Sequence, residues 1–232
     1  METQQEGRET AVSIKLEIYS DTICPWCYVG FARLREALAA RPDLDVRVDW
    51  LPFELNPDLP PEGEDRKAYM LRRFGDVDRF AAGQRQLQQL GAALGIDFQF
   101  ERVTRAPNTR RSHALIRWAG EQGGAALQMA VKERVLRAHF TEGRDLADPQ
   151  VLADVAAASG LDRDAALRAL DEPERRAAIE GLEAQAQAWG ISGVPTFIFE
   201  RRYAFSGAQP LEVFLGAFDR VVAERGGASQ PA

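Results

Sequence analysis

Hydrophobic and polar residues alternate in two short stretches near the start of the chain. The apolar face of the first stretch holds Val12, Ile14, Leu16 and Ile18, and that of the second holds Val46, Val48 and Trp50. A period of two residues is typical of a β-strand. Between the stretches, Phe31, Leu34 and Leu38 follow helical spacing, which predicts a helix from about Cys27 to Ala40. The chain is therefore predicted to begin with strand, helix and strand.

The middle of the chain has a different pattern. Residues 56–65 are rich in proline and acidic side chains, which predicts a loop. After this loop, apolar residues recur almost throughout at helical spacing. The helices predicted from that spacing are Arg66–Phe74, Asp78–Leu94, Thr109–Glu121, Ala125–Phe140, Pro149–Ser159, Ala165–Leu170 and Pro173–Trp189, with Asp148 as the N-cap of the Pro149 helix.

Strand character returns only near the end, at Thr196–Phe199 and Tyr203–Phe205, before an amphipathic helix that starts at Leu211. We expect residues 1–10 to be disordered and residues 226–232 to fray. The predicted class is α/β: a thioredoxin fold (βαβ…ββα) with a large helical insertion. The predicted thioredoxin-like domain is discontinuous, with residues 11–60 and 188–225, and the insertion domain comprises residues 61–187.

Charge and hydropathy narrow the possible partners. The formal net charge of −6 argues against a nucleic-acid partner, because phosphate binding relies on a basic surface. No stretch approaches the roughly 20 apolar residues that span a bilayer, so no membrane association is expected. Met1–Thr10 is polar and lacks the apolar core of a secretory signal. We therefore expect a soluble protein of the cytoplasm; its oligomeric state is not indicated.

The candidate chemistry lies in the two cysteines, Cys24 and Cys27, the only ones in the chain. They sit where the first strand meets the first helix, and the N-terminus of a helix stabilises negative charge. We expect a lowered pKa for Cys24, which would attack a disulfide, while the more buried Cys27 would resolve the mixed disulfide. Pro25 would stiffen the pair, and Trp26 would offer an aromatic face to a substrate or act as a lid.

The cysteine pair allows two other interpretations. A structural zinc site needs two further ligands, but there is no other cysteine, and His113 and His139 lie far apart in the sequence. The pair could also be an inert disulfide or a chance occurrence. The position between strand and helix favours redox chemistry, with no bound metal.

A second candidate element is the segment Gly193-Val194-Pro195-Thr196, which opens a predicted strand. A proline at the first position of a strand is tolerated for purely structural reasons. Together with the cysteine pair, it favours a cis Pro195 that faces the two sulfurs. The backbone of Val194 would then be available to an extended substrate segment.

Taken together, these segments resemble the DsbA-like thioredoxin superfamily, and within it the FrnE-like cytoplasmic branch. The resemblance covers about residues 12–224. The segments that carry it are Cys24-Pro25-Trp26-Cys27, Ile191–Phe197, Pro52–Pro57, Asn108-Thr109 with His113 shortly after, and Ser206–Pro210. It implies a thiol–disulfide oxidoreductase acting on protein disulfides or thiols. It implies no cofactor, with glutathione as a candidate thiol co-substrate.

Two departures from the family pattern affect this interpretation. DsbA has a histidine where Trp26 stands, so the pKa of Cys24 should be less extreme. Some FrnE-like proteins carry a further cysteine motif, so isomerase activity that needs extra cysteines is not expected here. The alternative function is a glutathione-dependent isomerase or transferase, similar to 2-hydroxychromene-2-carboxylate isomerases and kappa glutathione transferases. Those enzymes usually have serine at the position of Cys24.

The remaining polar residues allow more than one role. Asn108 is expected either to cap the following helix or to line the substrate site. Asp21 would cap a turn or tune the thiols, and the two histidines would be surface or core residues of helices. The arginines of the helix after Asn108 would form a solvated face or a patch for an anionic substrate: Arg110, Arg111 and Arg117.

Overall fold

The computed structural model describes residues 13–75 and 77–227. Its first elements are strand β1 (Ser13–Ser20), helix α1 (Pro25–Ala40) and strand β2 (Asp45–Pro52). The last elements are strands β5 (Thr196–Phe199) and β6 (Tyr203–Ser206) and helix α8 (Leu211–Gly227). The predicted α/β class and the βαβ…ββα order are confirmed.

These strands form one four-stranded sheet in the order β2-β1-β5-β6. β1 and β2 are parallel, whereas β5 runs antiparallel to both of its neighbours. The register places Ile18 opposite Trp50 on one side and Phe197 on the other. Segments from the two ends of the sequence thus meet in the middle of the sheet, where β1 and β5 pair.

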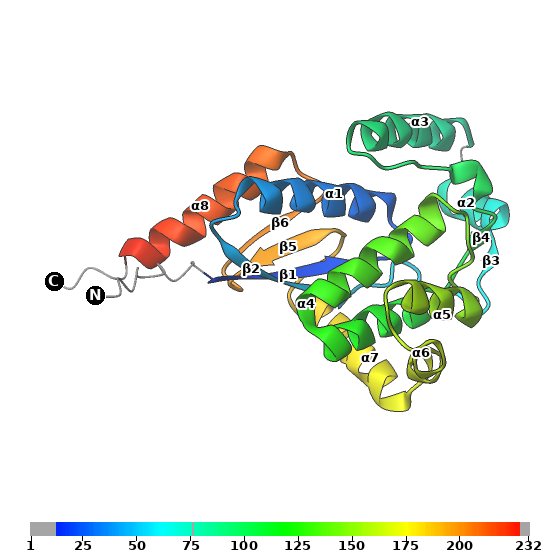
Figure 1. Cartoon of the computed structure of the whole chain (residues 1–232). Helices are drawn as coiled ribbons and strands as arrows, with labels where there is room; N and C mark the ends of the chain where they lie inside the picture. The colour runs from blue at the N-terminus through cyan, green and yellow to red at the C-terminus, as the bar shows by residue number, and fades with distance from the viewer. Residues whose placement is uncertain (1–12, 76, 228–232) are drawn as a thin grey trace.

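Side chains on the two faces of the sheet contribute to two separate hydrophobic clusters. On one face, Leu16, Ile18 and Phe197 are fully buried in the large core. Helices α1 and α8 lie together over this face (Figure 1). On the other face, Tyr19 and Ile198 pack against Ala186. The alternation of apolar and polar residues predicts one buried face; in the structure the second face of the sheet is covered as well, around Tyr19 and Ile198.

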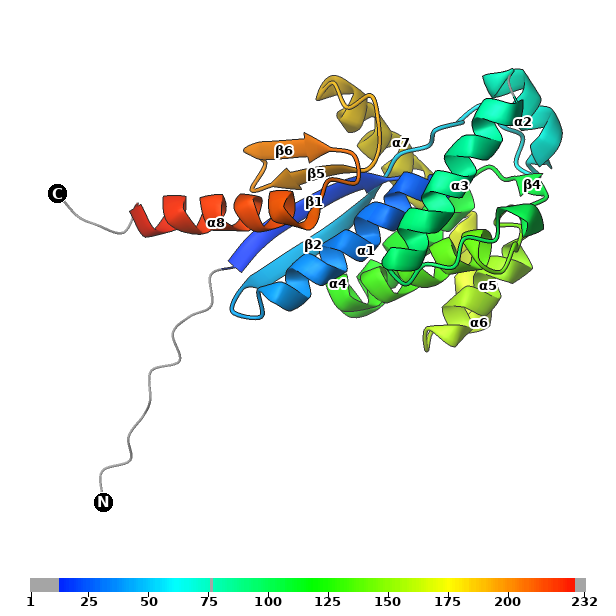
Figure 2. The ribbon, with the colours of Figure 1, turned by 90° about the horizontal axis from the view of Figure 1, so that it is seen from above.

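The segment between β2 and β5 is mainly helical and lies beside the sheet (Figure 2). Aspartates cap three of its helices, including the predicted cap Asp148, which accepts a hydrogen bond from Gln150 N. Its helices are α2 (Arg66–Phe74), α3 (Val77–Ala93), α4 (Arg110–Phe140), α5 (Pro149–Ala158), α6 (Arg163–Leu170) and α7 (Pro173–Ala188).

Two details, apart from small shifts in element boundaries, differ from the sequence prediction. Glu64–Asp65 (β3) pairs with Arg105–Ala106 (β4), so the segment is not purely helical and the predicted loop ends in a short strand. Phe100–Arg102 forms a 3₁₀ turn. The two helices predicted on either side of residues 122–124 are confirmed: they share the label α4, but the backbone is non-helical at Gly123 and Gly124 between them.

One side chain of α4 completes the exposed edge of β2. The amide oxygen of Gln128 accepts a hydrogen bond from Trp50 N at 2.9 Å, and its amide nitrogen donates to Trp50 O at 3.2 Å. A side-chain amide can replace a neighbouring strand in this way because it carries the same donor and acceptor groups as the backbone. Gln128 therefore fixes α4 against the sheet.

Among the described residues, no helix is both long enough and apolar enough to cross a bilayer. The disorder predicted for residues 1–10, the start of the first predicted strand and domain at residues 11–12, and the fraying of residues 228–232 lie outside the described residues. The division into residues 11–60 with 188–225, and 61–187, remains a prediction.

Candidate redox site

Cys24 and Cys27 lie at the N-terminus of α1. Cys24 is the N-cap residue in extended conformation, Pro25 is the first helical residue, and Cys27 N donates to Cys24 O at 3.0 Å. Both cysteines are free thiols; Cys24 is 6% exposed and Cys27 is fully buried. This is the predicted asymmetry, in which one sulfur is accessible and the other lies behind it.

The loop before β5 approaches the pair from the opposite side. The Val194–Pro195 peptide bond is cis, and Cys24 Sγ donates to Val194 O at 3.7 Å. Pro195 packs against α1 at Gly30, where an added Cβ would lie 3.0 Å from Pro195 Cγ. Because real Cβ contacts are rarely so close, glycine at position 30 allows this approach. The structure thus brings together Cys24, Val194 and Pro195 from the two ends of the chain.

The two thiols share a proton. The hydrogen bond with Cys27, together with burial, raises the pKa of Cys24 well above its ordinary value. Burial also opposes ionisation of Cys27, but the hydrogen bond from Cys24 and the charge of Lys132 outweigh it, so the pKa of Cys27 is lowered. The pair therefore has one low and one high pKa. The predicted lowering of the pKa of Cys24 is not found in this geometry, because the neighbouring Cys27 and burial both disfavour the Cys24 thiolate.

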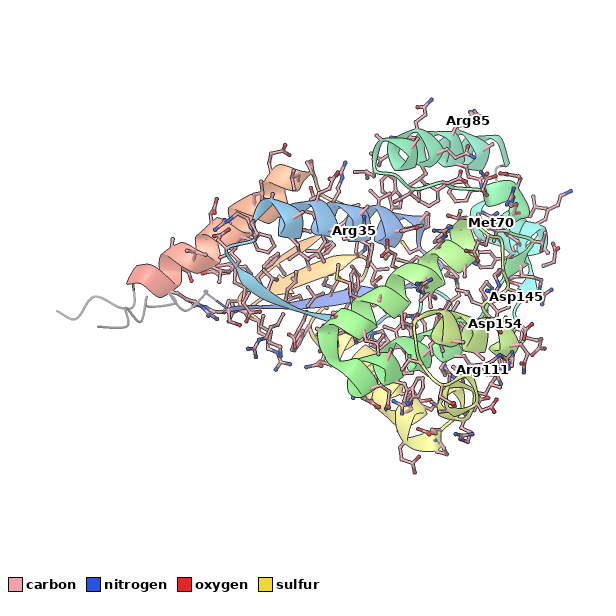
Figure 3. The ribbon with its side chains drawn as sticks, viewed as in Figure 1. Arg35, Met70, Arg85, Arg111, Asp145 and Asp154 are labelled. Atoms are coloured by element: carbon pink, nitrogen blue, oxygen red, sulfur yellow. The ribbon has the colours of Figure 1, made fainter. Side chains whose placement is uncertain are left out.

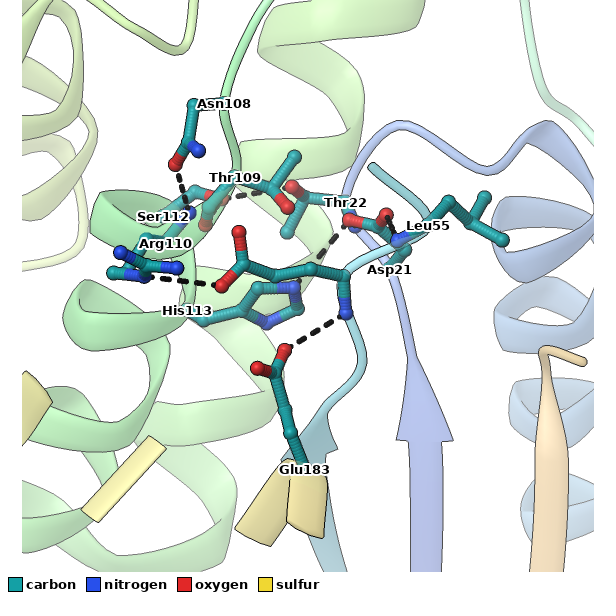
Figure 4. Close-up of polar contacts among 10 residues, drawn as sticks. Asp21, Thr22, Leu55, Asn108, Thr109, Arg110, Ser112, His113 and Glu183 are labelled. Atoms are coloured by element: carbon teal, nitrogen blue, oxygen red, sulfur yellow. Dashed lines mark hydrogen bonds and ion pairs between the residues drawn. The ribbon is translucent and has the colours of Figure 1, made fainter. Parts of the chain in front are cut away.

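Behind the cysteines lies a buried carboxylate, Asp21, which is fully buried. Its Oδ1 accepts from Thr22 N at 2.6 Å and lies 3.4 Å from His113 Nε2, and its Oδ2 accepts from Leu55 N at 2.8 Å (Figure 4). Burial opposes its ionisation, but His113 and the Leu55 amide lower the pKa of Asp21 overall. Asp21 thus both closes the turn after β1 and places a negative charge near the thiols.

A second buried carboxylate continues this polar cluster. The Glu54 side chain is 1% exposed, and its Oε1 accepts from Arg110 Nε at 3.1 Å. Its backbone nitrogen donates to Glu183 Oε1 at 2.9 Å, so α7 is also tied to the cluster (Figure 4). Burial and the charge of Glu183 raise the pKa of Glu54. Three elements far apart in the sequence are joined at this point.

Asn108 is buried and uses its amide within the fold. It donates to Leu59 O at 2.9 Å and accepts from Arg110 N, the first residue of α4, at 3.0 Å. The N-cap of α4 is Thr109, so Asn108 lies one residue before the predicted position and bonds to the first helical N–H from there. A substrate-binding role for Asn108 remains a prediction. Arg110, Arg111 and Arg117 pair with acidic residues of this chain: Glu54, Asp171 and Glu121 respectively.

A cavity of about 680 Å³ opens beside Cys24. Pro25 and Trp26 also line it, and Trp26 is 41% exposed. Met70, labelled in Figure 3, lines it from α2. Further lining residues are Leu55, Arg66, Tyr69, Phe100, Arg105, His139 and Phe140. Its volume is typical of sites for small molecules, and its wall is largely apolar with a few polar groups. Cys24 therefore faces a space large enough for a substrate.

The sequence left the place of His113 open between surface and core, and it did not identify Lys132. His113 is buried against Asp21, and Lys132 is 1% exposed on the inner face of α4. The signal for Lys132 was its spacing, since it lies four residues after Gln128 and four before Leu136, which are also buried. A lysine in a buried helical stripe is rare and marks a position with a specific electrostatic role.

Among the described residues, no group of three or more His, Cys, Asp or Glu side chains is placed to hold a metal ion. The arrangement instead consists of two thiols that share a proton, a carbonyl beside the accessible sulfur, and a buried charged cluster behind them. Such a site can donate or accept two electrons through a disulfide.

Comparisons with known proteins agree with this class of site. The model of the DSBA-like thioredoxin domain matches residues 15–219. A probable DsbA oxidoreductase from Streptomyces coelicolor is 32% identical, with a TM-score of 0.79; the match covers 94% of this chain and 92% of that one. The fold and the paired thiols together define a thioredoxin-like redox protein. The chain belongs to the DSBA-like thioredoxin domain family.

Two further structures share the fold at lower identity. A 2-hydroxychromene-2-carboxylate isomerase is 19% identical, with a TM-score of 0.68, and the match covers 93% of this chain and 100% of that one. The cytosolic disulfide reductase DsbM from Pseudomonas aeruginosa, solved with GSH, is 23% identical, with a TM-score of 0.62. The match covers 90% of this chain and 99% of that one. The predicted resemblance to DsbA-like proteins is thus confirmed.

Proposed function

We propose that this protein is a thiol–disulfide oxidoreductase that exchanges disulfides with protein or small thiol substrates through Cys24 and Cys27. The observation that carries the proposal is the position of Cys24. Cys24 lines the cavity and its sulfur contacts Val194 O, while Cys27 lies fully buried. These positions support a role for Cys24 in meeting the substrate and for Cys27 in resolving the mixed disulfide.

The proposed exchange proceeds in two displacements. The proton shared by the pair moves to Cys27, and the Cys24 thiolate attacks one sulfur of a substrate disulfide. A Cys24–substrate disulfide forms, and the other substrate sulfur leaves as a thiolate. Cys27 then gives up its proton and attacks Cys24 Sγ, which releases the second substrate thiolate. Two electrons have passed to the substrate, and Cys24 and Cys27 are joined; with a more oxidising pair, the same steps run in reverse.

Several finer features belong to the same proposal. Pro25, Trp26, Val194 and Pro195 would contact the substrate, and the carbonyl of Val194 would pair with an extended segment. The cytoplasmic location and the FrnE-like branch are proposed as well. Glutathione is proposed as a thiol co-substrate: a cytosolic disulfide reductase of the same fold has been solved with GSH, and the cavity beside Cys24 is of suitable size.

The test uses two matched serine variants with a disulfide-bonded peptide. Cys27→Ser should form a stable mixed disulfide with one peptide chain, because the resolving thiol is absent. Cys24→Ser should form none, because Cys27 is buried away from the cavity. Intact-mass spectrometry reads out both. The proposal is wrong if Cys27→Ser forms no adduct, or if Cys24→Ser forms it equally well.

The second candidate function is a glutathione-dependent isomerase or transferase. The cavity beside Cys24 and the fold shared with 2-hydroxychromene-2-carboxylate isomerase favour it. Such an enzyme needs one group that acts with glutathione but no resolving thiol. Cys27→Ser would therefore retain glutathione-dependent turnover under this alternative, whereas it would lose multiple-turnover disulfide exchange under the main proposal.

A further inference from the structure

Lys132 is the most unusual buried residue near the site. It lies on α4 with 1% of its surface exposed, and Val131, Val135 and Leu136 beside it are fully buried. Burial of an ammonium group is costly unless negative charge lies nearby. The surroundings of Lys132 therefore have to supply that charge.

The groups that face Lys132 come from three other parts of the fold. Its Nζ lies 5.4 Å from the centre of the Trp50 ring on β2, within the range of a cation–π contact. Burial lowers the pKa of Lys132, and the negative charges of Cys27, then of Asp21 and Cys24, oppose that effect. The Trp50 ring packs in turn on Phe31, with ring centres 5.5 Å apart, and Phe31 lies one turn after Cys27 on α1. Lys132 therefore lies on the side of the sheet that carries the cysteine pair.

The helix segment that carries Lys132 is bonded to the edge of the sheet. Gln128, one turn earlier on α4, bonds to both the backbone nitrogen and the backbone oxygen of Trp50. Trp50 is therefore fixed to α4 through its backbone while its ring faces Lys132. A charge fixed in this way acts on the cysteine pair without the cost of reorganising when a thiolate forms.

The balance of buried charge changes with the redox state of the cysteines. A reduced pair that has lost one proton carries one negative charge, whereas a disulfide carries none. With Lys132 protonated and Asp21 ionised in both states, their charges cancel, and His113 lies beside Asp21. A cation at this position therefore stabilises the reduced, ionised pair more than the disulfide.

We propose that Lys132 is the buried counter-ion of the Cys24–Cys27 thiolate and a positioning residue that raises the reduction potential of the pair. This inference rests on the proposed function. The reaction concerned is the exchange of the reduced pair with glutathione disulfide, which yields the Cys24–Cys27 disulfide and two molecules of glutathione. The helical segment thereby contributes to the chemistry of the thioredoxin-like site as well as covering it.

The first test compares Lys132→Met with Lys67→Met. The chain has three lysines, and Lys67 is exposed, so Lys67→Met is the matched control. Each protein is equilibrated in glutathione buffers at pH 8 and alkylated, and its mass is measured by intact-mass spectrometry. We expect Lys132→Met to shift the equilibrium about tenfold toward the disulfide, which corresponds to about 30 mV. Thiolate absorbance followed against pH should show that the lower of the two thiol pKa values is raised in Lys132→Met. Lys132→Arg should restore most of the wild-type redox equilibrium and most of the wild-type thiol pKa.

A second measurement uses the wild-type protein, in case Lys132→Met does not fold. With ¹⁵N-labelled lysine, the Nζ resonances of the three lysines are followed against pH in the reduced and oxidised states. Linkage is reciprocal, so a lysine that favours the thiolate must itself hold its proton more tightly when the thiolate is present. Lys132 should therefore have a higher pKa in the reduced protein, whereas Lys67 should not change.

The outcomes separate the two proposals. If wild-type protein exchanges with glutathione but Lys132→Met matches it in equilibrium constant and thiol pKa, the role of Lys132 is wrong and the proposed function stands. An Nζ pKa of Lys132 that is equal in both redox states also overturns the role. If wild-type protein forms no Cys24–Cys27 disulfide at any glutathione ratio, the proposed function itself fails.

Discussion

Charged side chains are arranged in opposite ways beneath the cysteine pair and on the outside of the helical segment. Beneath the pair, Asp21, His113 and Lys132 are almost completely buried. On the outside, Arg111 bonds to Asp171 at 2.8 Å, with side chains 30% and 51% exposed. Figure 3 shows Arg111 and Asp154 at the outer surface of these helices.

The two regions differ in the free energy needed to remove their charges from water. An exposed ion pair is surrounded by water, which screens it, so it contributes little to stability in either direction. A buried charge loses its hydration and depends on every partner that remains. A protein has little reason to keep a cluster of buried charges unless the charges serve the chemistry, and here they lie beside the two thiols. The following predictions test this contrast.

The largest expected effect is that of removing the buried carboxylate charge. Asp21→Asn would leave His113 and Lys132 without their buried anion, and we expect a loss of about 3 kcal/mol in the free energy of unfolding. Urea denaturation of the reduced protein at pH 7 measures it. The matched control is Asp171→Asn, which removes the same charge from the exposed pair. Equal losses in the two variants would show that burial does not set the cost.

The next effect concerns His139, which is buried beside the cavity. Burial, with a smaller contribution from Arg66, lowers the pKa of His139 to about 4. Between that value and the ordinary value near 6.5, the unfolded chain binds a proton that the folded chain does not. Acid therefore destabilises the folded state, and from pH 7 to pH 5 this histidine should account for a loss of about 2 kcal/mol.

His139→Phe should remove that part of the pH dependence. The substituted ring would keep a contact with Phe140, whose ring centre lies 4.7 Å from that of His139. Urea denaturation at pH 7 and pH 5 of both proteins gives the difference. An unchanged dependence on pH in the variant would mean that His139 is protonated in the folded state at pH 5.

The smallest effect is expected for the exposed pair. A double-mutant cycle with Arg111→Ala and Asp171→Asn should give a coupling energy below about 1 kcal/mol. The coupling should fall further when salt is added, because exposed charges are screened. A coupling as large as the loss in Asp21→Asn, or one independent of salt, would contradict the contrast between the two regions.

Much of the fold could be predicted because its signals are local. The helix Arg66–Phe74 and the strand Thr196–Phe199 have the predicted bounds, since amphipathic spacing and the flanking prolines and aspartates mark them. The pairing of Glu64–Asp65 with Arg105–Ala106 could not be predicted. Two-residue strands show no alternation, and their pairing depends on how distant segments pack.

Some residues of the site also carry a local signal in the sequence, whereas the positions of others depend on how distant segments pack. The cysteine motif and the Val194-Pro195 segment carry their own signals, so their roles could be proposed from the sequence. The positions of His113 and Lys132 beneath the thiols depend on how α4 packs on the sheet. The raised pKa of Cys24 could not be predicted either, because it depends on burial and on the contact with Cys27 rather than on the helix N-terminus alone.

The most direct test of the central claim is the redox equilibrium of the wild-type protein with glutathione. Samples are equilibrated at a series of ratios of glutathione disulfide to glutathione and quenched by alkylation. The mass of the intact protein is then measured by mass spectrometry. We expect Cys24 and Cys27 to change together, from two alkylated thiols to none, as a single two-electron step. Two alkylated cysteines at every ratio, or glutathione attached to Cys24 with Cys27 still alkylated, would contradict the account.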